Sequence, residues 1–190
     1  RILATAALAT ALSTGAAQAQ KDELVIGISQ FPQGFHPNIA SHVALSLING
    51  MTRRPFTVYD AEWKLICQLC TTLPSREAGT IRDWTTPDGK PGLEVDYTIQ
   101  KGATWGDGKP ITTEDVQFTW EIGRNETSGV NNQELYRRME KIVSKDDKSF
   151  TIFWNKRTCE AEAINDFEIV PAHLERDAAS EPAAYRTRNA

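Results

Sequence analysis

Apolar and polar residues alternate most strictly in the stretch 94–100. Val95, Tyr97 and Ile99 fall on one face of an extended chain, and the residues between them are polar. A period of two is the signature of a strand with one buried face. The pattern therefore predicts a half-buried β-strand that ends close to residue 100.

A turn and a capped helix are predicted directly after this strand. Gly102 and the pair Asp107-Gly108 tolerate turn conformations, and Pro110 cannot donate a hydrogen bond to a continuing strand. Thr112 followed three residues later by Asp115 has the spacing of a helix N-cap with an acidic first turn. The apolar spacing of residues 116–122 fits either a helix or a strand, and the cap favours a helix.

The rest of the chain continues this mixture of strands and helices. The pattern predicts a buried strand at 24–28, a helix from Asn38 to a C-terminal Gly50, and a hairpin formed by 56–59 and 64–69. The stretch 75–92 is rich in glycine and proline and is expected to be a surface excursion.

Three elements are predicted in the last third of the chain. Leu135, Met139 and Ile142 have the spacing of one helix face, and 149–154 alternate as a strand. Pro171 is placed where it can open a last helix. The predicted fold class is α+β, a mixed α/β arrangement.

The first nineteen residues have the character of a secretory signal peptide. Residues 2–11 are apolar and uncharged, and Ala17-Gln18-Ala19 is a small-x-small cleavage site. The alternative is a short N-terminal helix, but the run has no polar stripe. We therefore expect export, and no later segment is apolar enough to span a bilayer.

Composition is that of a globular protein without an affinity for polyanions. The 190 residues are 40% hydrophobic and carry a formal net charge of -4. No block of lysines or arginines occurs along the chain. This charge pattern argues against nucleic acid or an anionic membrane as the main partner.

The cysteines allow more than one interpretation. Cys67 and Cys70 have the C-x-x-C spacing of a redox or zinc site, but no second pair follows. None of the three histidines is at ligand spacing from them: His36, His42 and His173. We favour a structural disulfide from Cys159 to one member of the pair, or buried thiols, over metal or redox function.

No catalytic residue emerges from the sequence. Glu114 and Asp115 are a carboxylate pair, as in a glycosidase, but adjacent helix residues point in different directions and helix capping explains them better. The segment 106–108 lacks the further glycine spacing of a dinucleotide loop. The five tryptophans fit core positions better than sugar stacking.

The order of these motifs resembles the peptide-type extracellular solute-binding proteins of ABC importers, also called family 5. The resemblance covers essentially the whole chain after the signal peptide, and Val170-Pro-Ala-His173 looks like the family's return after its next strand. The chain departs at Phe35-His36-Pro37, where the family usually has Leu-Asp-Pro. The matching positions, in the turn and in the first part of the helix, are Lys101, Gly102, Trp105, Asp107, Gly108, Pro110, Thr113, Asp115, Val116 and Phe118.

The resemblance implies a periplasmic-binding-protein-like two-lobe fold, of which this chain would supply only part of the first lobe. The implied boundaries are a signal peptide at 1–19, the start of a main subdomain at 20–48, an inserted small subdomain at 49–168, and a return to the main subdomain at 169–190. The second lobe would be missing from this sequence.

The function that the resemblance implies is capture of a solute rather than catalysis. A peptide or related small solute would be bound in the periplasm and delivered to the permease subunits of an ABC transporter, without a cofactor or a metal, by a monomeric protein. Near-wall ligand contacts are expected from the loop after the first strand, and the turn of Gly102, Trp105, Asp107 and Gly108 is expected to be scaffold. The loop residues are Phe31, Gln33, Gly34 and Phe35.

Two other classes of function are compatible with an exported α+β chain. A secreted carbohydrate-active enzyme would need a second carboxylate across a cleft, and the sequence places no such pair. A purely structural exported module would gain no stability from any ligand.

Overall fold

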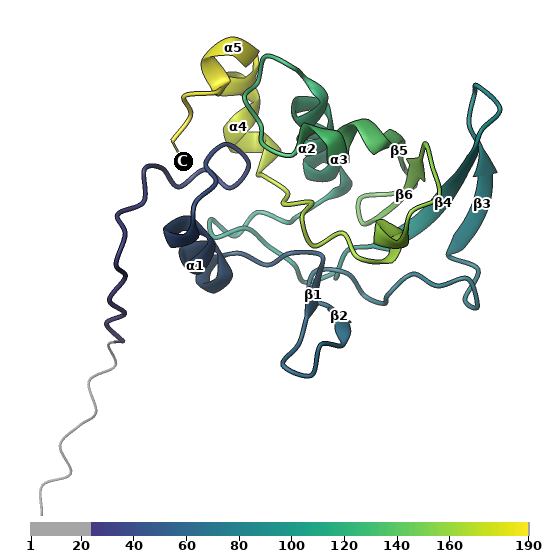
Figure 1. Ribbon diagram of the computed structural model, residues 1–190, viewed down its shortest axis with the longest axis horizontal. Coiled ribbons are helices and arrows are strands. Elements are labelled where there is room, and N and C mark those ends of the chain that lie inside the picture. Colours follow the sequence, from purple (N-terminus) through teal and green to yellow (C-terminus); the bar gives the residue numbers. More distant parts are fainter. Residues whose placement is uncertain (1–23, 190) are drawn as a thin grey trace, which may run out of the picture.

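The computed structural model of the protein describes residues 24–189, and its centre is a four-stranded antiparallel sheet. The strands are β3 (Ile81–Thr85), β4 (Pro91–Thr98), β5 (Met139–Ser144) and β6 (Ser149–Trp154). Their order in the sheet is β3-β4-β6-β5, so the two central strands are distant in sequence (Figure 1). The mixture of this sheet with helices confirms the α+β prediction.

The alternation in β4 determines which face of the sheet is buried. Val95 and Tyr97 are almost fully buried and lie opposite Ile152 and Phe150 of β6. The rings of Tyr97 and Phe150 stack with centroids 5.7 Å apart. This face carries the hydrophobic core, as the period-two pattern predicted.

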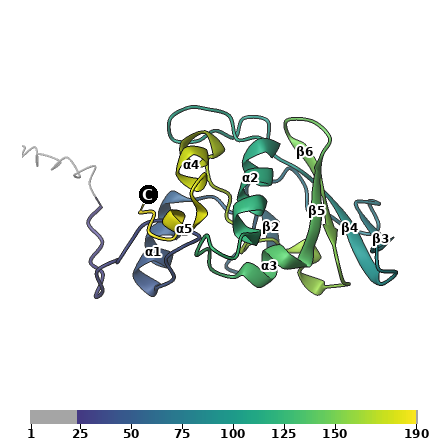
Figure 2. The ribbon, with the colours of Figure 1, turned by 90° about the horizontal axis from the view of Figure 1, so that it is seen from above.

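Helices α2 (Thr113–Arg124) and α3 (Gln133–Arg138) lie beside the sheet, as Figure 2 shows from above. Helix α4 (Ala172–Ala179) packs on α2, so α2 lies between α4 and β5. Helices α1 (Val43–Thr52) and α5 (Pro182–Tyr185) lie beyond them, at the end of the molecule opposite β3. A short 3-10 helix, η1 (Cys159–Glu162), follows β6.

A small hairpin extends from the body, as the sequence predicted. Its strands are β1 (Thr57–Tyr59) and β2 (Leu65–Cys67). The Asp60 carboxylate accepts hydrogen bonds from the backbone amides of Glu62 and Lys64, which closes the turn. Trp63 has a left-handed backbone, with φ 59°, and is 83% exposed.

The predicted first helix is displaced along the chain. Residues 37–39 form a turn instead, and α1 begins only after His42, whose ring accepts a hydrogen bond from the Leu45 amide. At the other end, Gly50 lies inside the helix, and its φ is not positive. Asn38 is therefore not the N-cap, and Gly50 is not the C-terminal glycine.

Three other predicted elements also differ from the structure. Residues 24–28 are not a buried strand: Leu24 is 83% exposed, and no strand of the described residues pairs with this segment. The excursion 75–92 contains β3, which pairs along β4. Met139 and Ile142 belong to β5 rather than to a helix, because pairing with β6 outweighs a spacing that fits both structures.

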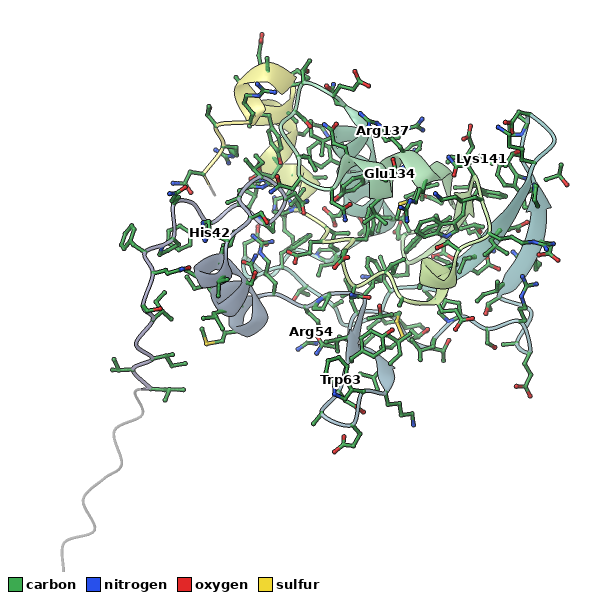
Figure 3. All side chains as sticks on the ribbon, in the orientation of Figure 1. His42, Arg54, Trp63, Glu134, Arg137 and Lys141 are labelled. Atoms are coloured by element: carbon green, nitrogen blue, oxygen red, sulfur yellow. A yellow bond between two sulfur atoms is a disulfide. The ribbon has the colours of Figure 1, made fainter. Side chains whose placement is uncertain are left out.

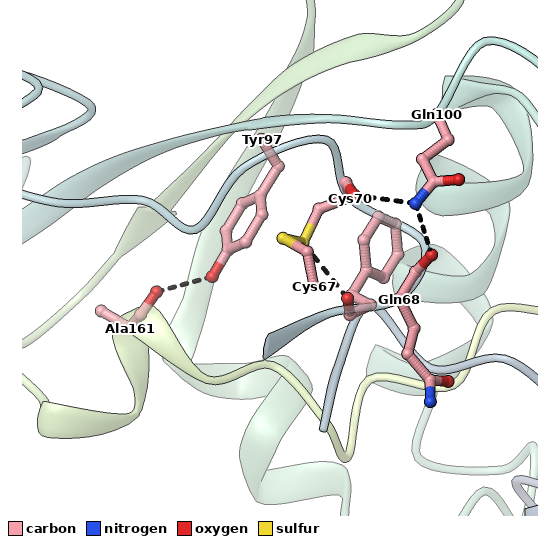
Figure 4. Close-up of a disulfide and its surroundings, with 7 residues drawn as sticks. Cys67, Gln68, Cys70, Tyr97, Gln100 and Ala161 are labelled. Atoms are coloured by element: carbon pink, nitrogen blue, oxygen red, sulfur yellow. Dashed lines mark hydrogen bonds between the residues drawn. A yellow bond between two sulfur atoms is a disulfide. The ribbon is translucent and has the colours of Figure 1, made fainter. Parts of the chain in front are cut away.

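The disulfide joins Cys67 to Cys70, with Cα atoms 5.2 Å apart, so the expected bond to Cys159 is wrong (Figure 4). β2 ends at Cys67, and the chain then turns inward to bury Leu69 and Cys70. The side chain of Gln100 donates hydrogen bonds to the carbonyls of Gln68 and Cys70. The turn between the two cysteines brings their sulfurs together, and Gln100 holds its backbone from a distant segment.

None of the helices within residues 24–189 is long and apolar enough to cross a membrane.

Candidate functional site

A cavity of about 970 Å³ lies where α1 approaches the turn after β4. This volume is within the range that small-molecule sites occupy in proteins. Several separate segments line it together with α1, and many of the lining side chains are polar. The lining includes Pro37, Asn38, His42, Asn49, Arg53, Arg54, Trp105, Asn131, Asn132, Asp166 and Glu168.

The segment 37–39 forms one wall of the cavity and is fixed by hydrogen bonds to distant parts of the chain. The side chain of Asn38 donates to the Glu168 carbonyl at 2.8 Å. Asn131 donates from its backbone to the Asn38 carbonyl and from its side chain to the Ile39 carbonyl, both at 2.6 Å. A wall held at several points presents its groups in one geometry, which favours specific binding.

His36 lies directly behind this wall and is 1% exposed. Its Nδ1 accepts a hydrogen bond from the Asn38 amide at 3.2 Å, and its Nε2 lies 2.8 Å from the Tyr185 hydroxyl. Burial lowers the pKa of His36 to about 4, and although the Glu175 carboxylate opposes this shift, Arg53 and Arg188 reinforce it. The imidazole is therefore neutral near pH 7.

Glu175 joins His36 to the end of the described chain. Its carboxylate accepts hydrogen bonds from the Arg188 guanidinium at 3.1 and 3.2 Å, and it lies 3.8 Å from His36 Nε2. Glu175 is itself 4% exposed. A buried carboxylate is tolerated here because it is paired and hydrogen-bonded.

His42 marks the start of α1, and Arg54 follows the end of that helix (Figure 3). The His42 ring faces two backbone amides, with Leu45 at Nδ1 and Gln33 at Nε2, each at 3.2 Å. A neutral imidazole has one unprotonated nitrogen, so it accepts only one of these hydrogen bonds at a time. The ring therefore accepts either from the start of the helix or from the preceding loop.

Charged groups of both signs line the cavity. Burial is the main cause that lowers the pKa of Arg53, and the nearby Glu168 and Glu175 carboxylates oppose it. Burial also raises the pKa of Glu168, and one of its carboxylate oxygens is enclosed without a hydrogen-bond donor among the described residues. These groups give the cavity polar chemistry suited to orienting a polar solute.

The carboxylate pair suggested by the sequence is not arranged for acid–base chemistry. Asp115 is 4% exposed, and its oxygens accept hydrogen bonds from the Thr112 amide, the Trp105 indole and the Ala172 amide. Glu114 is exposed and pairs with Arg176 at 2.8 Å. Helix capping and tertiary bridging explain both residues.

The four residues expected to contact a ligand lie together in the loop before this cavity, but none of them lines it. Phe31 is 91% exposed and Phe35 is 43% exposed. Gly34 is buried, and the Phe35 amide donates to the Asn189 side chain at 2.9 Å. The Gln33 amide faces the His42 ring, as described above. Their contact with a ligand stays a prediction.

Sequence reasoning missed most of the cavity. The expectations are a helix cap at Asn38 and scaffold at Gly102 and Trp105, yet all three residues line the cavity. No local motif marks such a site, because its walls come from segments more than one hundred residues apart. The available signal was the clustering of Asn, Arg and His in turns that flank α1.

Within residues 24–189, no group of three or more His, Cys, Asp and Glu side chains is arranged to hold a metal ion.

Comparison with known proteins places the chain in a family. Residues 80–188 match the model of the bacterial extracellular solute-binding proteins, family 5 Middle. No curated protein sequence matches the chain.

Solved structures have the same fold. The oligopeptide-binding protein of Thermus thermophilus, complexed with a pentapeptide, is 31% identical over 87% of this chain, with a TM-score of 0.73. AppA of Bacillus subtilis, in complex with a nonapeptide, is 21% identical over 83% of this chain, with a TM-score of 0.66. NikZ of Campylobacter jejuni, in complex with Ni(L-His), is 16% identical over 90% of this chain, with a TM-score of 0.65.

The chain spans between 28% and 30% of the length of those three proteins. The two structures below 25% identity support the fold alone, whereas the family match covers more than half of the 190 residues. On that match, this chain belongs to the bacterial extracellular solute-binding proteins, family 5.

Proposed function

We propose that this chain supplies part of the solute-binding face of an ABC importer's binding protein, and that the solute is a peptide or a related small molecule. The protein would capture the solute outside the cytoplasmic membrane and deliver it to the permease subunits. Binding would be coupled to delivery through a higher affinity for the closed state of the protein.

The observation that carries this proposal is the cavity between α1, the turn at 102–106 and the segment 165–169, with its polar lining residues. Its wall at 37–39 carries backbone groups that are fixed by side-chain hydrogen bonds. Extended peptides are recognised largely through backbone hydrogen bonds, with pockets that accommodate side chains. The loop of Phe31, Gln33, Gly34 and Phe35 would extend this wall.

The finer assignments follow from family membership and are part of the same proposal. Residues 1–19, outside the described residues, would be a signal peptide that directs the protein to the periplasm. Residues 20–48 and 169–190 would belong to a main subdomain, and 49–168 would be a small subdomain inserted into it. The complete protein would act as a monomer.

A binding experiment tests the function directly. The whole gene product that contains this sequence should be purified without refolding and examined by native mass spectrometry for a retained solute. Titration with a set of di- to pentapeptides should then change the tryptophan fluorescence, because Trp105 lines the cavity. The Trp105→Phe variant should bind with a smaller fluorescence change, while Trp63→Phe, on the exposed hairpin, should keep the full change.

The proposal fails if no peptide or other small solute is retained by the protein or raises its Tm in a broad screen. The alternative of a secreted carbohydrate-active enzyme predicts hydrolysis of a glycan instead. Asp115 is occupied by three hydrogen bonds and Glu114 is exposed, so this alternative has no placed acid–base pair among the described residues.

A further inference from the structure

His36 joins two parts of the molecule that are distant in sequence and meet behind the cavity wall. Its ring contacts the Asn38 amide on one side and the Tyr185 hydroxyl on the other, across a sequence separation of 149 residues. The Tyr185 ring also meets the imidazole edge-on, with centroids 5.3 Å apart. Both His36 and Tyr185 are 1% exposed.

The two hydrogen bonds together determine the protonation state that the site accepts. Nδ1 must be unprotonated to accept from the Asn38 amide, so Nε2 carries the proton and donates to the Tyr185 oxygen. A second proton on Nδ1 would place an N–H against the Asn38 N–H. That change would break one of the hydrogen bonds that hold Asn38, a residue of the cavity wall.

The charges around His36 come from several elements. Glu175 in α4 lies 3.8 Å from Nε2 and favours the protonated ring. Arg53, after α1, and Arg188, after α5, oppose protonation of the ring. Arg188 also donates a hydrogen bond to the Glu175 carboxylate. Burial adds to the effect of the two arginines, so the neutral ring prevails at neutral pH.

We infer that His36 is a positioning residue for the solute-binding wall, and that it holds Asn38 in place only while its imidazole is neutral. This inference rests on the proposed function, because it assigns a role in that same site. It adds a property that the function alone does not require: acidification should loosen the wall at 37–39 and weaken solute binding before the fold is lost.

Hydrogen exchange measured by NMR tests the inference without any ligand, using the whole gene product. The protection factor of the Asn38 amide should be roughly tenfold lower in His36→Ala than in the unmodified protein at pH 7. His36→Asn should stay within roughly threefold of the unmodified protein, because its amide oxygen can replace Nδ1 as acceptor. Amides of the central strand β6 serve as the internal reference for global stability.

The pH dependence separates positioning from a merely structural role. Between pH 7 and pH 4, Asn38 protection in the unmodified protein should fall roughly fivefold relative to β6, because about half of His36 is then protonated. The His36→Asn variant should show no such fall. His173→Asn, which changes an exposed histidine, should behave as the unmodified protein does.

Binding of penta-alanine, which has no titrating side chain, then tests whether the wall at 37–39 takes part in solute binding. Affinity should fall roughly twofold between pH 7 and pH 4 in the unmodified protein, because about half of the molecules then carry the protonated ring, and it should fall less in His36→Asn. The inference is overturned if Asn38 protection is unchanged in His36→Ala, if His36→Asn keeps the pH response, or if penta-alanine binds with one affinity at both pH values. If penta-alanine fails to bind while the exchange results are as expected, the positioning role of His36 is supported and the proposed peptide function loses support.

Tyr185→Phe takes the place of His36→Ala if that variant does not fold. Tyr185→Phe keeps the ring contact and removes the oxygen that accepts from Nε2, so Asn38 protection should again fall at pH 7. Unchanged Asn38 protection in Tyr185→Phe would contradict the role of the hydrogen bond between His36 and Tyr185.

Discussion

The carboxylate of Asp115, in the first turn of α2, accepts a hydrogen bond from the backbone amide of Ala172, 57 positions further along the chain. The same side chain accepts from the Thr112 amide and from the Trp105 indole. One buried carboxylate thus caps α2, fixes a residue of the cavity lining and joins α4 to both.

Replacing Asp115 should therefore destabilise the protein strongly. In Asp115→Asn the side-chain NH₂ group faces backbone and indole N–H donors, and we expect a loss of about 3 kcal/mol in the free energy of unfolding. Urea unfolding followed by circular dichroism measures this loss. Glu114→Gln is the control, since Glu114 is exposed and its pair with Arg176 should contribute less than about 0.5 kcal/mol. Equal effects of the two substitutions would contradict the role of Asp115.

Two glycines in helices should respond to alanine in opposite directions. A Cβ atom at Gly123 would overlap the Tyr136 ring, so Gly123→Ala should cost about 2 kcal/mol through overpacking. A Cβ atom at Gly50 would meet nothing within 4 Å, and Gly50→Ala should stabilise α1 by about 0.5–1 kcal/mol.

Thermal unfolding of the two glycine variants gives the measurement. The sign of the stability change in Gly50→Ala also shows whether Gly50 has a helical backbone or the left-handed backbone of a C-terminal glycine, which the sequence predicted. A destabilising Gly50→Ala would favour the left-handed alternative.

The disulfide pairing can be read from a tryptic digest without reduction. Cleavage after Lys64 and Arg76 releases one peptide that contains both Cys67 and Cys70. We expect this peptide to be two hydrogens lighter than its reduced form and not linked to the peptide that contains Cys159. The same peptide should appear unchanged in Cys159→Ser.

The energetic effect of this disulfide should be moderate because the loop that it closes is short. Replacing both Cys67 and Cys70 by serine should lower the free energy of unfolding by about 2 kcal/mol.

In the tryptic digest, a disulfide-linked pair of peptides that includes Cys159 would contradict the pairing of Cys67 with Cys70.

Asp96 should make the stability of the protein depend on pH over an acidic range that differs from the range of His36. Burial opposes its ionisation, but hydrogen bonds from Arg82, Lys145 and Thr151 outweigh that effect and hold its pKa well below 3.8. A carboxyl whose pKa is lower in the folded state contributes stability above pH 3.8, and this contribution is lost as the pH falls further. The stability of Asp96→Asn should therefore vary less below about pH 4 than that of the unmodified protein.

The window of Asp96 lies below that of His36. The pKa of His36 is lowered from 6.5 to about 4, so its contribution to stability is complete above pH 6.5 and declines as the pH falls towards 4. Stability curves of Asp96→Asn and His36→Asn, measured from pH 7 to pH 3, should thus flatten in different ranges. Flattening in the same range would contradict these assignments.

The parts of the fold that sequence predicted correctly are those in which local pattern and tertiary packing agree. Val95 and Tyr97 alternate and are buried, and the Thr112 cap begins a helix as expected. The errors lie where one spacing fits two structures: Met139 and Ile142 suit a helix face but pair as a strand with β6. Long-range pairing, which a local pattern does not contain, decided between them.

The candidate site could be predicted only in part for the same reason. The proline and glycine loop before α1 was expected near a ligand, but the cavity is completed by Trp105, Asn131 and Glu168 from remote segments. His36 has the local pattern of an ordinary loop residue, because its partner Tyr185 lies 149 residues away. Fold-level contacts of this kind have no signature in the spacing of neighbouring residues.

The exposed segment 24–28 affects how this chain behaves in solution. Four of its five residues have large aliphatic side chains, and Leu24 and Val25 are at least 80% exposed. Short uncharged aliphatic stretches without proline are prone to intermolecular β-pairing. Turbidity and apparent mass should therefore rise with protein concentration, and a charged residue in place of Val25 should improve solubility without touching the cavity.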